Sequence, residues 1–69
     1  MMVTMYGPCV RIRHSMHAAV LYVEVRRPDD TWAPLPDGAF NEAHNGLAHK
    51  QAAALAMATR RKLIEGENV

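Results

Sequence analysis

Hydrophobic and polar residues alternate with period two in the first half of the chain. Over residues 9–14 two apolar side chains, Val10 and Ile12, alternate with two cationic ones, Arg11 and Arg13. This pattern predicts a short half-buried strand. The alternation is clearest over residues 18–27. There the two sets are Leu21, Val23 and Val25 on one side, and Val20, Tyr22, Glu24 and Arg26 on the other. We therefore expect two antiparallel strands joined by a tight connection at residues 15–17.

Proline, aspartate and glycine bound a third predicted strand. Residues 28–30, Pro-Asp-Asp, have the composition of a turn, so residues 31–35 can pair back onto the preceding strand. Pro34 has no amide hydrogen to donate, which predicts an edge position for this strand. We expect residues 36–38, Pro-Asp-Gly, to end it. Phe40 is the large apolar residue that follows and is expected to tuck under the sheet.

The last third of the chain predicts one alanine-rich helix over residues 47–64, capped by Asn45 or by Asn41 and stopped by Gly66. At about 100° per residue its apolar positions form two stripes on nearly opposite sides. The first stripe is Ala48, Ala52, Leu55, Thr59 and Leu63. The second is Ala53, Met57 and Ile64, flanked by His49, Lys50, Arg60 and Arg61. One stripe is enough to pack on a sheet, so the second predicts a surface for a partner.

Together these elements predict one small α+β domain over residues 1–69. Two or three antiparallel strands pack on one C-terminal helix in two layers. Residues 1–8 and 67–69 are expected to be flexible. A chain this short buries little surface, and its single cysteine provides no disulfide. Small chains without such links often gain stability by association, which favours a homodimer or a tightly bound partner.

Composition and charge say more about the cellular location of the protein than about its function. Hydrophobic residues make up 49% of the chain, charged residues make up 22%, and the formal net charge is +1. The longest apolar run, residues 18–23, is too short to span a bilayer, and the start of the chain lacks the pattern of a signal peptide. We expect a soluble protein of the bacterial cytoplasm or of a phage-infected host cell, without membrane contact.

The residues that could carry chemistry do not form a catalytic or metal-binding pattern. Cys9, His14 and His17 lack a matching second pair of zinc ligands, because His44 and His49 are five residues apart and fall on different helical faces. Cys9 with one of the nearby histidines is the candidate dyad, but residues five apart on a strand point to opposite faces. No nucleotide-binding motif occurs. We expect no enzymatic activity, no metal and no cofactor.

Basic residues leave a nucleic-acid-binding function as an alternative. Its candidate contacts are Arg11, Arg13, Tyr22, Arg26 and Lys50. An aromatic ring among arginines can stack on bases or hold phosphates. Residues 49–54, His-Lys-Gln-Ala-Ala-Ala, resemble the last helix of double-stranded RNA-binding domains, where a lysine pair contacts phosphates ahead of an alanine-rich stretch. His49 stands in place of one of those lysines, and no first helix precedes the strands.

The layout of strands ahead of an alanine-rich helix, without a catalytic set, is similar to that of small phage and mobile-element inhibitors, including some anti-CRISPR proteins. The resemblance implies steric blockade of a host defence complex. Our leading hypothesis is therefore a non-enzymatic protein-binding module. Its predicted contact residues are Ala53, Met57, Arg60, Arg61 and Ile64.

Overall fold

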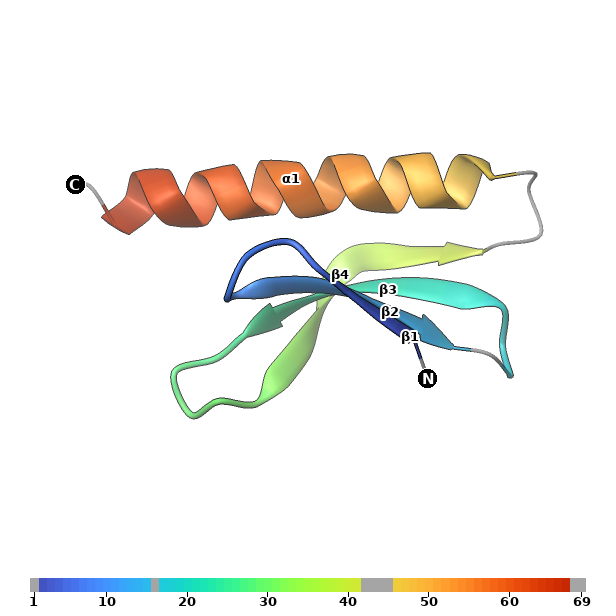
Figure 1. Cartoon of the computed structure of the whole chain (residues 1–69), viewed down its shortest axis with the longest axis horizontal. Helices are drawn as coiled ribbons and strands as arrows, with labels where there is room; N and C mark the ends of the chain where they lie inside the picture. The colour runs from blue at the N-terminus through green and yellow to red at the C-terminus, as the bar shows by residue number, and fades with distance from the viewer. Residues whose placement is uncertain (1, 16, 42–45, 68–69) are drawn as a thin grey trace.

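The computed structural model describes residues 2–15, 17–41 and 46–67, which form a four-stranded antiparallel sheet and one helix (Figure 1). The elements are β1 (Met2–Met5), β2 (Val10–Ser15), β3 (Val20–Arg26), β4 (Trp32–Asn41) and α1 (Leu47–Glu67). Strands neighbour one another in chain order, and α1 lies along one face of the sheet. The predicted α+β class is confirmed, with four strands in place of two or three.

The core lies between α1 and the central strands, as the alternation predicts. Val10, Ile12, Leu21 and Val23 are at most 5% exposed. They meet a helix stripe of small residues, Ala48, Ala52 and Ala56, which are at most 2% exposed. A side chain of one methyl group lets the helix backbone approach the sheet closely, and large residues from the strands then fill the layer between them. Ala56 was missing from the stripe predicted for this face.

The turns use left-handed residues where the sequence offers no glycine. Ala19 has a φ of 51° just before β3, and Asp30 has a φ of 68° between β3 and β4. Aspartate tolerates this region better than most residues. The turn predicted at residues 28–30 is confirmed, and the Asp30 N–H donates to the Arg27 carbonyl at 2.9 Å. Met16, in the predicted connection between the first two strands, lies outside the described residues.

The interpretation of residues 1–8 as a flexible lead-in missed a strand. Residues 2–5 form β1, which pairs with β2 from Met2 opposite His14 to Met5 opposite Arg11. All four β1 residues are exposed, so no one-sided burial pattern marks them in the sequence. At the other end α1 reaches Glu67, while residues 68–69 lie outside the described residues.

The prediction that residues 36–38 end the third strand was wrong. Pro34 lies opposite Glu24 and Ala39 lies opposite Tyr22, so residues 35–38 of β4 face only Val23 of β3. The proline, aspartate and glycine therefore make a bulge, after which β4 continues. Gly38 is buried there, and a Cβ atom on it would lie 2.9 Å from the Val23 carbonyl oxygen. The predicted edge position of this strand is confirmed.

Phe40 packs against the core as expected, but from within β4 and not from a loop. Asn41 also belongs to β4 and so does not cap the helix, whereas Asn45 lies outside the described residues. Gly46, with a φ of 80°, directly precedes α1. Gly66 lies inside the helix and does not stop it.

The C-terminal end of α1 projects past the strands (Figure 1). The helix packs on β2, β3 and β4, and no contact with β1 occurs among the described residues. Leu63 falls on the sheet-facing side of the helical wheel yet is 42% exposed, because a hollow that it lines together with Cys9, Arg26 and Pro28 separates it from this end of the sheet. Its predicted burial was therefore wrong.

Candidate protein-binding surface

The second apolar stripe of the helix is exposed. Met57 is 59% exposed and Ile64 is 47% exposed, and Ala53 is half-buried. On a wheel of about 100° per residue, Met57 lies about 140° from Ala52, the centre of the buried stripe. Arg60 and Arg61, both exposed, lie on either side of the Met57–Ile64 line. We call these five residues, Ala53, Met57, Arg60, Arg61 and Ile64, the helix surface.

The helix surface continues onto the loop between β1 and β2. One shallow hollow is lined by Met57, Arg60, Arg61 and Ile64. A second hollow of about 110 Å³ lies between the helix and the loop, and its lining is Tyr6, Pro8, Cys9, Val10, Arg60, Leu63 and Ile64. Since Arg60 and Ile64 line both hollows, they form one continuous surface. Sequence reasoning assigned Leu63 to the core and missed its place here.

Glycine lets the loop and Arg60 lie close together. Gly7 has a φ of 93°, and a Cβ atom on it would lie 3.0 Å from Nε of Arg60. A side chain at position 7 would therefore be strained and would displace the guanidinium. The Tyr6 N–H donates to the Val10 carbonyl at 2.8 Å, which closes this loop. This backbone hydrogen bond joins two residues that line the second hollow.

The helix surface combines exposed apolar area with positive charge. Within the part of the chain that the structure describes, neither Arg60 nor Arg61 pairs with a carboxylate. Methionine adapts to varied apolar partners because its side chain is flexible and polarizable. Arginine can bind a partner carboxylate through two parallel hydrogen bonds. The arrangement can hold an apolar side chain of a partner while pairing with acidic groups beside it.

The opposite face of the sheet, which we call the outer sheet face, carries a compact cluster of charged and aromatic residues. The Glu24 carboxylate accepts hydrogen bonds from Nε of Arg11 at 2.8 Å and Nε of Arg13 at 3.2 Å. The Arg11 guanidinium lies 4.3 Å from the ring centre of Trp32, and that of Arg13 lies 4.6 Å from that of Tyr22. The cluster buries Glu24 to 4% exposure.

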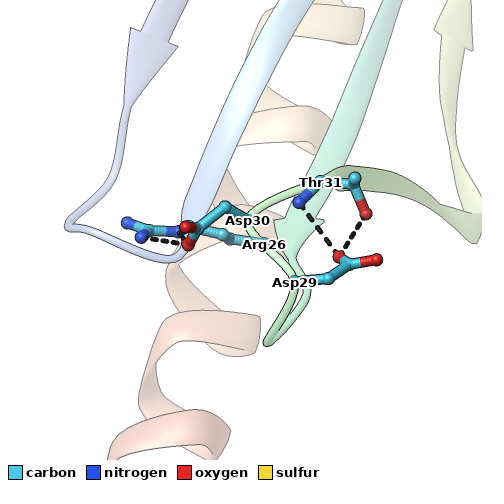
Figure 2. A network of polar contacts seen from close by, with 4 residues as sticks. All are labelled: Arg26, Asp29, Asp30 and Thr31. Atoms are coloured by element: carbon cyan, nitrogen blue, oxygen red, sulfur yellow. Dashed lines mark hydrogen bonds and ion pairs between the residues drawn. The ribbon is translucent and has the colours of Figure 1, made fainter.

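Arg26 lies at the end of β3 and is paired within the chain. Its guanidinium donates to the Asp30 carboxylate, with Nε at 3.0 Å from Oδ1 (Figure 2). This hydrogen bond and the negative charge of Asp30 raise the pKa of Arg26 above its usual value. In the same turn the Thr31 hydroxyl and N–H both donate to the Asp29 carboxylate. The hydroxyl contributes most to lowering the pKa of Asp29.

The residues predicted to bind nucleic acid do not share one surface. Arg11, Arg13 and Tyr22 lie together on the outer sheet face, and Arg26 is paired at its end. Lys50 is exposed on α1, in the other layer. Trp32 belongs to the outer cluster and was missed. Alternation over residues 31–35 places Trp32 on the same side of its strand as Pro34. Since cross-strand partners share a face, this alternation could have assigned Trp32 to the cluster.

The cysteine and histidines occupy separate parts of the fold. Cys9 is half-buried in the loop before β2, and the exposed His17 lies in the turn before β3. His14 of β2 lies beside His49 of α1, with ring centres 5.3 Å apart, a pairing that the sequence spacing did not suggest. No group of three or more potential metal ligands occurs among the described residues, which do not include His44.

No helix within the described ranges is long and apolar enough to cross a bilayer. No protein-family model, curated protein or solved structure matches this chain.

Proposed function

We propose that this protein is a non-enzymatic protein-binding module that recognises an acidic surface of another protein through the helix surface. The observation that carries the proposal is the continuous hollowed area around Met57, Arg60 and Ile64, where large apolar side chains remain exposed beside two arginines. Scattered apolar residues are common on protein surfaces, but a contiguous patch with a charged border is typical of an interaction site.

The charges support a partner of acidic character. Arginine is enriched at binding hot spots, and positive charge beside an apolar centre accelerates encounter with a negatively charged partner. The two arginines are available for this because no described carboxylate pairs with either of them. Binding should therefore weaken with added salt, but less than for a protein that depends on phosphate contacts alone.

The narrower hypothesis, that the chain is a phage or mobile-element inhibitor of a host defence complex, stays a prediction. It would act by steric blockade, with the helix surface covering a site on the complex. It is tested by adding the purified chain to such a complex and measuring target binding and cleavage. Unchanged activity at saturating inhibitor would reject the narrower hypothesis while leaving the binding module open.

The test of the binding module uses charge reversal of the apolar centre. A partner is identified by pull-down and mass spectrometry, and its affinity is then measured with purified proteins. Met57→Glu should weaken binding at least about tenfold, since it places a carboxylate in the apolar contact facing an acidic partner. Ala58→Glu is the matched control, because it adds the same charge to an exposed position of the same helix about 100° away. Equal affinities of Met57→Glu and the wild type would overturn the proposal.

Nucleic-acid binding is the second candidate function. It is favoured by the position of Arg11, Arg13 and two aromatic rings on a sheet face that no described element covers. Two observations rank it below protein binding. Glu24 and Asp30 already pair with three of its arginines. A guanidinium also lies over each ring, where a base would stack. The test is a gel-shift series against single strands, duplex DNA and duplex RNA at low salt. The absence of a shift with all three would reject nucleic-acid binding.

A further inference from the structure

The two edges of the sheet differ in how they are protected. Natural sheets block unwanted pairing at an edge with proline, charge or a bulge. The β4 edge has all three, with Pro34, Pro36, Asp37 and the bulge over residues 35–38. The β1 edge, with the sequence Met-Val-Thr-Met, has none of these three and is protected only by its short length of four residues. The chain therefore prevents strand addition at one edge and permits it at the other.

The β1 edge is also apolar, and no described element covers it. Met2 is 60% exposed, Met5 is 53% exposed and Val3 is 38% exposed. The helix packs on the other three strands and, among the described residues, does not reach β1. Val3 and Met5 lie on the outer sheet face, because they stand opposite Arg13 and Arg11. Apolar side chains on an edge without proline, charge or a bulge indicate a surface that another strand covers.

The hydrogen-bonding pattern between β1 and β2 determines which backbone groups of β1 can pair with a further strand. The Tyr6 N–H donates to the Val10 carbonyl at 2.8 Å, which makes Tyr6 and Val10 a hydrogen-bonded pair. In an antiparallel ladder such pairs alternate, so Thr4 and Met2 point their N–H and C=O groups toward β2. The N–H and C=O groups of Val3 and Met5 then point away from the sheet.

We propose that β1 pairs antiparallel with β1 of a second copy of this chain, with Val3 opposite the partner's Met5 and Thr4 opposite the partner's Thr4. This register meets both geometric conditions of an antiparallel pair. Residues that face each other lie on the same side of the sheet, and the outward backbone groups of Val3 and Met5 meet those of the partner. A twofold axis normal to the sheet relates the copies. The sheet doubles in width, and both helices lie on the same face.

A second copy fits this edge better than an unrelated strand, because the edge is complementary to itself. Val3 and Met5 of the two copies form one apolar cluster on the outer sheet face, and no charge on β1 opposes a like charge on the other copy. The strand is short, so the interface is small. Small interfaces are weak, so we expect dimerisation only at high protein concentration.

Paired charge substitutions test the register directly. Val3→Glu with Met5→Glu places like charges opposite each other twice across the dimer, and the full chain should stay monomeric in sedimentation velocity up to about 1 mM. In the monomer the same substitutions stand opposite Arg13 and Arg11, so the fold should tolerate them. Val3→Glu with Met5→Lys places opposite charges together twice and should dimerise at least as well as the wild type.

A backbone substitution tests the hydrogen bonds. Val3→Pro removes an N–H that points away from β2, so it should weaken dimerisation at least about tenfold and leave the circular dichroism spectrum unchanged. Val3→Thr keeps the N–H and the branched side chain and is the matched control. A wild-type chain that is monomeric at 1 mM overturns the proposal. So does a dimer that persists in Val3→Pro, or one that is lost only in Met57→Glu, which would assign association to the helix surface.

Discussion

Replacing Glu24 with glutamine should destabilise the protein by removing the shared partner of two arginines. The Glu24 side chain is 5% exposed, while those of Arg11 and Arg13 are 20% and 28% exposed. Each carboxylate oxygen accepts from one guanidinium. A glutamine amide has one acceptor oxygen and one donor nitrogen, so it can satisfy only one arginine and turns a donor toward the other.

The size of the effect follows from these two bonds. A hydrogen bond to a charged group contributes about 1.5–3 kcal/mol and a neutral one about 1 kcal/mol. Because both arginines keep contact with water, screening favours the low end of the range for each bond. We expect Glu24→Gln to lower the free energy of unfolding by about 2 kcal/mol. For a domain of this size that corresponds to a drop of roughly 10 °C in Tm.

Urea unfolding followed by circular dichroism measures this loss. Fluorescence of Trp32, the only tryptophan, gives a second readout from the same cluster. Added salt should recover part of the stability lost by the variant, since it screens the repulsion between Arg11 and Arg13. Asp30→Asn is the control, because it removes a carboxylate from an exposed arginine pair and should change stability little.

The reasoning is refuted if Glu24→Gln unfolds within about 0.5 kcal/mol of the wild type. It is also refuted if salt shifts the variant and the wild type alike. Either result would mean that the carboxylate does not neutralise the two arginines and that cation–π contacts alone hold them in place.

Two further predictions concern the helix packing and the turn. Ala52→Leu should lower the free energy of unfolding by about 1–3 kcal/mol in urea titrations, because Ala52 is fully buried where the helix approaches the sheet. Ala54→Leu, on the exposed side, should have little effect; equal losses would contradict this helix orientation. Thr31→Val should raise the pKa of Asp29 toward 3.8 in a carboxyl NMR titration, since the hydroxyl bond is the largest cause of its lowering. Because the folded pKa is lowered, the bond stabilises the turn above the ordinary pKa and is lost as pH falls through the folded value; an unchanged pKa would rule the bond out.

The sequence by itself determined the elements whose two sides differ. Val10, Ile12, Leu21 and Val23 alternate with polar residues because one face of their strands packs on the helix, and the buried alanines repeat at helical spacing for the same reason. The Pro-Asp-Asp composition of residues 28–30 also predicted the turn there. The exposure of Met57 and Ile64 followed from their place opposite the buried stripe.

Only the tertiary structure decided what depends on distant neighbours. β1 has no one-sided pattern because both of its faces are exposed, so its pairing with β2 is what makes it a strand. The β4 bulge contains proline, aspartate and glycine, which are also the residue types that end strands. The register against β3 decides whether the strand ends there or continues. Leu63 is exposed because a hollow separates it from the end of β3, and Glu24 is buried because cross-strand pairing brings two arginines to it. Periodicity reports which side of an element is apolar, whereas the extent of the layer that covers that side is set by the packing of the whole chain.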